Sequence, residues 1–236
     1  MKISKNIVKI ISSFTLATAL IPSVGAATAQ DFKNIDIVQT SSDQSSASHG
    51  SYEYLSYQMY PYGIEITDCS EDAVSVEIPS EINGSPVVSI GANSFSESYN
   101  LEKIEIPESV TSIGDRAFYN CEKLSVITLP DSVERIGSDA FSGTEYYNND
   151  NNWTDGALYI NNHLIEAAYN ISSSYEIKPG TVSIASNAFS AARMLSMVTI
   201  PGSVVSIGDY AFYGCSYLRS AAIPEGVKYI GESAFR

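Results

Sequence analysis

Hydrophobic positions recur along most of this chain with a period of about 23 residues, a length typical of stacked repeats. The clearest mark is a phenylalanine five residues after an isoleucine. These phenylalanines are evenly spaced except for one interval about twice as long as the others: Phe95, Phe118, Phe141, Phe189, Phe212 and Phe235. A unit of this length cannot bury its own apolar face, so successive units must stack and share a core. The pattern therefore predicts a repeat solenoid, interrupted once.

Each unit contains the signals of one short strand and one turn. Ile104 and Ile106 alternate with polar residues, as in a strand with one buried face. Pro107 follows, and a residue without a backbone N–H fits the end of a strand better than its middle. The spacing from Asp115 to Phe118, with Asp as a cap, predicts one turn of 3₁₀ or α-helix on the opposite face.

These residues resemble the BspA-like leucine-rich repeats, whose pattern runs roughly LxxIxIPxSVxxIGxxAFxxC. The resemblance covers residues 74–236, with five or six successive copies. It implies a right-handed leucine-rich-repeat solenoid with short parallel β-strands on the concave face and short 3₁₀ or α turns on the other. It also implies a bacterial protein that is secreted or displayed on the cell surface, in several members linked to adhesion.

Residues 1–29 have the order of a secretory signal peptide. Three lysines precede an apolar run at 10–21, and small residues follow up to Ala29. The alternative is an uncleaved membrane anchor, but the run is shorter than the roughly 20 residues that span a bilayer. We therefore expect a cleaved leader, no membrane span in the mature chain, and a secreted or cell-surface location.

The region between the leader and the repeats has two parts. Residues 30–51 include a Ser-rich stretch without periodicity, which predicts a flexible linker. Residues 52–73 are rich in Tyr and contain Gly63 between alternating apolar runs, which predicts an N-terminal capping hairpin. A sugar-stacking surface is the alternative for these tyrosines. The repeats then occupy 74–236, and the last unit stops one residue after its Phe, which we interpret as an incomplete C-terminal end.

The longest break in the period, at about 142–171, is the candidate binding segment. Apolar runs flank Asn161-Asn162-His163, which predicts a β-hairpin. We select its aromatic residues as candidate ligand-binding residues, since loops carry function and Tyr and Trp are frequent in binding hot spots: Tyr146, Tyr147, Trp153 and Tyr159. The alternative is that these rings only pack the segment onto the solenoid.

The solvent-facing positions of the predicted concave strands are the second candidate surface. They include Lys103, Glu105 and Met197, and most of the others are small and neutral. They contain neither an aromatic stripe for sugar rings nor a basic row for anions. An extracellular protein is therefore the expected ligand, with a glycan as the second option.

Charge and side-chain chemistry exclude several function classes. The net charge of −14 becomes −17 when residues 1–29 are removed, which disfavours nucleic acid and anionic membranes. The sequence offers no catalytic constellation, no cofactor motif and no metal-ligand set. Cys121 and Cys215 occupy the same place in distant units, so we expect both to be free, buried side chains.

Two functional hypotheses remain. The first is a non-catalytic binding or adhesion module, not an enzyme, that binds a protein ligand. The second is the repeat portion, for targeting or spacing, of a larger exported enzyme or anchored surface protein. The oligomeric state is not predicted.

Overall fold

Successive coils, each with short parallel strands joined by turns, make up most of the computed structural model, which describes residues 48–236. The predicted signal peptide and residues 30–47 of the predicted linker lie outside the described residues. Helix is confined to α1 (Glu145–Asn148) and the 3₁₀ turn η1 (Asp150–Asn152) within the described range. The predicted solenoid with a 23-residue period is confirmed.

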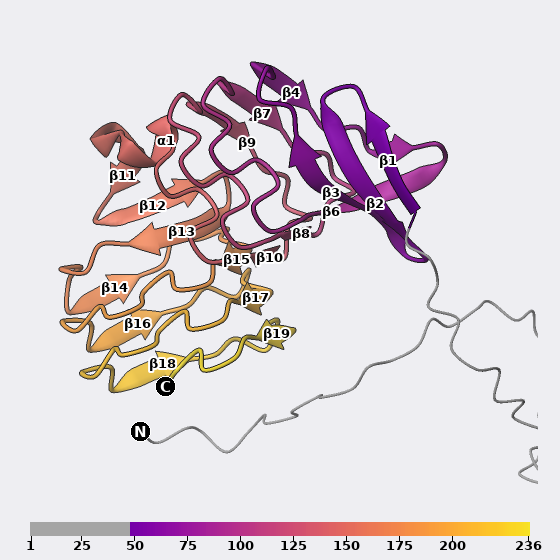
Figure 1. Ribbon diagram of the computed structural model, residues 1–236. Coiled ribbons are helices and arrows are strands. Elements are labelled where there is room, and N and C mark those ends of the chain that lie inside the picture. Colours follow the sequence, from indigo (N-terminus) through magenta and orange to yellow (C-terminus); the bar gives the residue numbers. More distant parts are fainter. Residues whose placement is uncertain (1–47) are drawn as a thin grey trace, which may run out of the picture. The chain divides into compact units, whose positions relative to one another are not determined.

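Six three-residue strands form the outer row, so named because Figure 1 shows it on the outside of the curved solenoid. They are β4 (Ser75–Glu77), β7 (Lys103–Glu105), β9 (Val126–Thr128), β14 (Ser174–Glu176), β16 (Met197–Thr199) and β18 (Ser220–Ala222). The row consists of two parallel sheets, β4-β7-β9 and β14-β16-β18. The central residue of each strand, such as Ile104, points into the core, and the flanking residues face solvent.

A second set of strands forms the inner row, on the inside of the curve (Figure 1). It comprises β6 (Ser85–Ile90), β8 (Ser112–Ile113), β10 (Arg135–Ile136), β15 (Ser183–Ile184), β17 (Ser206–Ile207) and β19 (Tyr229–Ile230). A glycine follows most of these strands because neighbouring coils approach closely there. A Cβ on Gly137 would clash with the backbone nitrogen of Asp115 in the preceding coil, so no larger residue fits.

The segment after each inner strand is a series of turns and not the predicted helical turn. One residue per coil takes a left-handed conformation, with φ between 55° and 61° except at the last coil, where it is 49°: Asn93, Arg116, Asp139, Asn187, Tyr210 and Ser233. A left-handed residue interrupts a right-handed helix. Alternate backbone N–H groups bond the neighbouring coil, as in Arg116 N to Ser138 O at 2.8 Å and Phe118 N to Ala140 O at 2.7 Å. The N–H groups between them form turn bonds within the coil, as in Tyr119 N to Arg116 O at 3.1 Å.

The recurring phenylalanines stack inside the coils. Phe118 lies between Phe95 and Phe141, with ring centroids 4.9 and 5.2 Å away. A second stack runs from Phe189 through Phe212 to the last coil, with centroid distances of 4.8 and 4.9 Å. Two apolar cores result, one mainly in the N-terminal half and one in the C-terminal half, and residues of the inserted segment contribute to both.

An antiparallel sheet precedes the first coil. It contains β1 (Ser48–Tyr52), β2 (Leu55–Tyr60) and β3 (Gly63–Cys69), and β3 pairs in parallel with β6. The hairpin of β2 and β3 therefore lies where a capping hairpin was expected. Strand β1 starts within the predicted linker, because residues 48–52 pair with β2 in register. A smaller strand, β5 (Glu81–Ile82), folds back on β6.

The inserted segment forms the predicted hairpin and bends the solenoid. Its strands are β11 (Trp153–Thr154), β12 (Ala157–Ile160) and β13 (His163–Ala167). The start of β13 pairs in parallel with β15 of the inner row, and the hairpin extends from there to the outer side, between β9 and β14. The inner rows of the two halves stay in contact: Ser186 N donates to Ile136 O at 2.9 Å. The hairpin separates the two sheets of the outer row, whereas the two halves of the inner row remain joined. The outer row is therefore longer, and the coils curve toward the inner row.

The bend places the outer row, predicted to be concave, on the convex side. Lys103, Glu105 and Met197 therefore lie on the outside of the curve, and the inner row lines its hollow (Figure 1). The sequence period alone does not decide which row is concave. The decision comes from the side on which the hairpin is inserted.

Candidate binding surfaces

The aromatic residues at the start of the inserted segment are half-buried. Tyr146, Tyr147 and Trp153 pack against the N-terminal core. The rings of Tyr147 and Trp153 meet edge to face with their centroids 5.4 Å apart. The indole Nε1 of Trp153 donates to the carbonyl oxygen of Tyr147 at 2.8 Å. These contacts hold the segment on the solenoid and leave only part of each ring for a ligand.

The hydroxyl groups of these tyrosines already have partners. Tyr146 donates to the carbonyl oxygen of Tyr159 at 3.0 Å, and Tyr147 donates to Oε2 of Glu166 at 3.0 Å. Burial raises the pKa of Tyr146 and of Tyr147, and it also raises the pKa of Glu166. Both hydroxyls therefore stay protonated and engaged at neutral pH.

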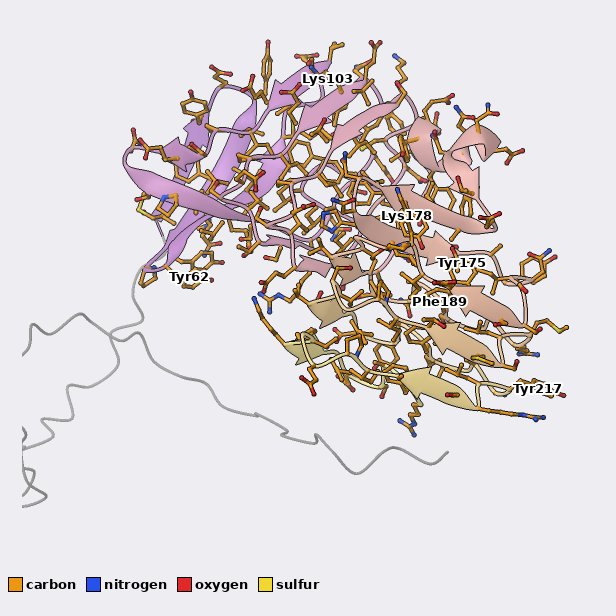
Figure 2. The ribbon with its side chains drawn as sticks, turned by 180° about the vertical axis from the view of Figure 1, so that it is seen from behind. Tyr62, Lys103, Tyr175, Lys178, Phe189 and Tyr217 are labelled. Atoms are coloured by element: carbon orange, nitrogen blue, oxygen red, sulfur yellow. The ribbon has the colours of Figure 1, made fainter. Side chains whose placement is uncertain are left out.

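Tyr159 joins the hairpin to the next coil. Its hydroxyl lies 3.3 Å from that of Tyr175 and accepts from the backbone N–H of Lys178 at 3.2 Å. The ammonium group of Lys178 lies 5.8 Å from the centre of the Tyr159 ring. Figure 2 labels Tyr175 and Lys178 at this junction. Tyr159 is therefore engaged in the contact between hairpin and solenoid.

Lys103 and Glu105 form an ion pair with each other on β7. The Nζ and Oε1 atoms are 2.5 Å apart, and both side chains are more than 40% exposed. The hydrogen bond to Glu105 raises the pKa of Lys103. Exposed pairs of this kind contribute little to stability and leave both groups free to exchange partners.

Met197 lies in the C-terminal half among other exposed apolar side chains, which we name the apolar strip. Its members come from three adjacent turns: Tyr169, Met194, Met197 and Tyr217, with 79%, 63%, 49% and 63% of their surface exposed. Met194 and Tyr217 stand at the same position of successive repeats, in coils joined by parallel pairing, so they are neighbours. Figure 2 shows Tyr217 at the outer edge of the C-terminal half.

The N-terminal half has fewer exposed apolar side chains in this region, with Tyr99 49% and Val126 48% exposed. Asn100 and Lys123 occupy the positions that correspond to Met194 and Tyr217, and Lys123 Nζ donates to Asn100 Oδ1 at 3.1 Å. Solvent exposure of Tyr and Met in three consecutive turns is therefore a property of one half and not of the repeat. Contiguous exposed apolar surface of this kind marks interaction sites.

The two halves also differ in charge. Residues 48–168 carry 20 acidic and 4 basic side chains, a net charge of −16. Residues 169–236 carry 4 acidic and 5 basic side chains, a net charge of +1. Arg193 and Arg219 are exposed, and each stands within two positions of a member of the apolar strip in sequence. The strip thus lies in the only part of the described chain without an acidic excess.

His163 connects the two halves from within. It is fully buried, with Nε2 3.0 Å from the carbonyl oxygen of Pro130 and Nδ1 2.8 Å from Oγ of Ser183. Because a carbonyl oxygen only accepts, Nε2 carries the hydrogen and Nδ1 accepts from the Ser183 hydroxyl. Burial lowers the pKa of His163. The neutral imidazole is therefore a structural connection and not a ligand-binding group.

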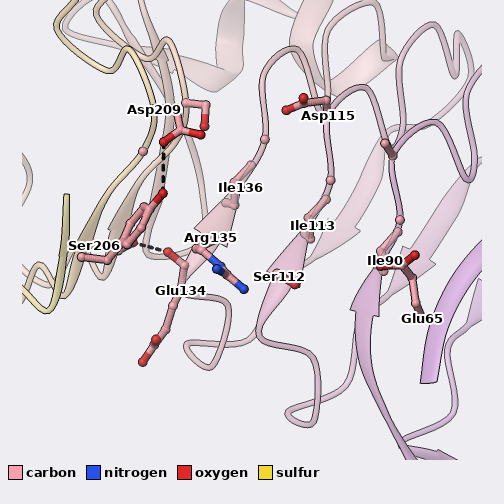
Figure 3. Close-up of a pocket in the computed structure, with 17 residues that line it drawn as sticks. Glu65, Ile90, Ser112, Ile113, Asp115, Glu134, Arg135, Ile136, Ser206 and Asp209 are labelled. Atoms are coloured by element: carbon pink, nitrogen blue, oxygen red, sulfur yellow. Dashed lines mark hydrogen bonds between the residues drawn. The ribbon is translucent and has the colours of Figure 1, made fainter. Parts of the chain in front are cut away.

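The inside of the bend contains a hollow of about 350 Å³ (Figure 3). Residues of the inner row, of the adjoining strand β3 and of the turns after the strands line it, including Glu65, Ser112, Arg135, Asp209 and Tyr229. At its base, the Ser206 hydroxyl donates to the carbonyl oxygen of Glu134, whose carboxylate pairs with Lys228 at 3.2 Å. These contacts join coils that are up to 94 residues apart.

Sequence reasoning missed His163 and the inner face. His163 stands in the turn of the predicted hairpin, and its burial depends on coils 33 residues before and 20 residues after it. The predicted cysteine environment is confirmed: Cys121 and Cys215 are free and buried, and burial raises the pKa of the Cys121 thiol to about 12. In residues 48–236, we find no cluster of three potential metal ligands and no helix of the length and apolarity that a bilayer span requires.

The chain belongs to the BspA-type leucine-rich repeat family. The family model matches six repeat copies, over residues 88–173 and 149–236, which together cover more than half of the sequence. This agrees with the stacked coils and their shared cores. No curated protein matches the chain.

Several solved structures are similar to this chain. A leucine-rich repeat protein of Treponema pallidum is 27% identical, with a TM-score of 0.46, over 78% of this chain and 86% of that one. A leucine-rich cell surface protein of Faecalibacterium prausnitzii is 25% identical, with a TM-score of 0.44, over 80% of this chain and 52% of that one. A leucine-rich repeat protein of Bacteroides ovatus is 24% identical, with a TM-score of 0.42, over 77% of this chain and 55% of that one. The chain thus spans about half the length of the latter two.

Proposed function

We propose that this protein is a non-catalytic binding module, exported to the cell surface or the medium, that takes part in adhesion by binding a protein ligand. The observation that carries the proposal is the apolar strip, where four large apolar side chains are exposed on adjacent turns. Tyr and Met are enriched in protein interfaces, and few other regions of a soluble surface tolerate them in a group.

The chemistry of the ligand follows from the surroundings of the strip. Arg193 and Arg219 are the charged residues next to it in sequence, in a half of net charge +1. The rest of the described chain is strongly acidic and repels acidic partners at long range. A ligand surface that combines apolar side chains with a few carboxylates therefore fits the strip best.

Export is supported by the N-terminal pattern of lysines, apolar residues and small residues. The alternative function, a repeat portion of a larger exported enzyme or anchored protein, remains compatible with the same strip. Both versions place ligand binding on the solenoid, so they share the test below.

The test compares two double variants of the full chain as immobilised bait for extracellular proteins. Met194→Ser with Tyr217→Ser changes the strip, and the matched control, Asn100→Ser with Lys123→Ser, changes the corresponding positions of the N-terminal half. All four side chains are exposed, so both variants should fold. We expect the strip variant to lose a protein that the wild type and the control retain.

Equal retention by all three proteins would rule out the strip as the binding surface. A further outcome is self-association: a wild-type dimer in analytical ultracentrifugation that the strip variant abolishes would identify the ligand as a second copy of this chain.

A further inference from the structure

A pair of stacked tyrosines lies on the same face of the inner sheet as the hollow. The rings of Tyr60 and Tyr62 are parallel within 5°, with centroids 5.2 Å apart, and Tyr62 is 67% exposed. Tyr60 pairs with Gly63, two positions from Glu65, which lines the hollow. Residues two apart on a strand share a face and lie about 7 Å from each other. Partial burial and the Glu65 carboxylate raise the pKa of Tyr60, which agrees with this proximity.

The surface next to the tyrosines is polar and continuous. Strands β2, β3, β6, β8 and β10 are neighbours in one sheet, so the distance from Tyr60 to Arg135 is four strand steps, or roughly 19 Å. Glu65, Ser112 and Arg135 lie along this path. Ion pairs within residues 48–236 are Lys103–Glu105 and Lys228–Glu134, which leaves the exposed Arg135 guanidinium for other contacts.

Tyr229 is a third aromatic residue, on the opposite side of the hollow. It belongs to β19, is 39% exposed, and donates from its hydroxyl to Oδ1 of Asp209 at 3.1 Å. Figure 3 labels Asp209 at the wall of the hollow, so this hydrogen bond fixes the ring there. Aromatic side chains are thus present at both ends of a polar floor.

We propose that this face binds a neutral oligosaccharide. A sugar ring has one face of C–H groups, which packs on an exposed aromatic ring, and a rim of hydroxyls, which bond carboxylates, guanidinium and serine. The lining contains four carboxylates and one arginine, Arg135, which disfavours acidic glycans and nucleic acid: Glu65, Asp115, Glu134 and Asp209.

An extended peptide is a poorer fit because it needs a free strand edge. The strands from β2 to β8 are paired on both sides. Strand β1 is one edge of the sheet, and β10, whose Arg135 lines the hollow, is the other. That edge is already engaged, since Ser186 of the other half donates its N–H to the carbonyl oxygen of Ile136. The face therefore offers side chains and not backbone groups to a ligand.

This site is separate from the apolar strip, so the two proposals can fail independently. The full chain is applied to an array of neutral oligosaccharides of glucose, galactose, mannose and N-acetylglucosamine, with sialylated and sulfated chains as comparison. Calorimetry with the strongest neutral oligosaccharide then compares Tyr62→Ala with Tyr217→Ala, which removes a similarly exposed tyrosine from the strip.

We expect neutral chains to bind, Tyr62→Ala to weaken affinity about tenfold or more, and Tyr217→Ala to leave it unchanged. Arg135→Ala should also weaken binding, since it removes a hydrogen-bond donor at the other end of the path. Absence of neutral hits, preference for acidic chains, or equal losses in the two tyrosine variants would overturn the proposal.

Discussion

The substitution Phe118→Ala probes the stacked core at its centre. Phe118 is fully buried and has a ring partner on each side, at 4.9 and 5.2 Å. Removing a buried phenylalanine leaves a cavity that its stacked neighbours cannot fill, at a cost of about 3–5 kcal/mol. In a domain of this size each kcal/mol lowers the melting temperature by about 2–4 °C, so we expect a decrease of roughly 10 °C.

Two controls separate stacking from general sensitivity. Phe235→Ala removes the ring at the end of the other stack, where Phe212 contacts it at 4.9 Å and the side chain is only partly buried. It should cost about half as much or less. Lys103→Ala removes an exposed ion pair and should leave the stability nearly unchanged. Guanidinium unfolding monitored by circular dichroism gives the free energy of unfolding of all three variants. If Phe118→Ala lowers this free energy no more than Phe235→Ala does, stacking does not determine the stability of the core.

Three further predictions concern the inserted segment and the thiols. Because burial lowers the pKa of His163 below its unfolded value of 6.5, the unfolded chain takes up a proton first, and stability should fall as the pH decreases below about 6.5; His163→Gln should flatten this dependence in thermal melts across that range, and an unchanged slope would contradict it. Cys121 and Cys215 should react with iodoacetamide only after unfolding, as mass spectrometry would show, because both thiols are buried. Trp153→Ala should lower the melting temperature, because packing is lost, and should leave the ligand affinity of the folded protein unchanged. A lower affinity with an unchanged melting temperature would show instead that Trp153 contacts the ligand.

The repeat made the fold predictable from sequence. The Phe period and the Ile104-x-Ile106 pattern indicate which residues face the core, because any stacked coil must bury the same positions. The predicted helical turn was wrong at Arg116 and Tyr210. These residues have no special preference for left-handed conformations, and they adopt them because backbone bonds to the next coil stabilise the turn.

The candidate binding surfaces were less predictable, for two physical reasons. Tyr146 and Trp153 stand in an Asn-rich segment that suggests exposure, yet both are half-buried because they pack on the N-terminal core. The direction of the bend likewise depends on where the hairpin inserts, which the sequence period does not indicate. Met197 was identified from its outward register alone, since a strand alternates its faces whichever way the solenoid curves.

Binding of a protein ligand by the apolar strip can be measured residue by residue with hydroxyl-radical footprinting and mass spectrometry, because exposed Met and Tyr side chains are readily oxidised. We expect Met194, Met197 and Tyr217 to be oxidised in the free protein and protected in the complex, while Trp153 changes little. Protection of Trp153 with undiminished oxidation of the three strip residues would contradict this assignment.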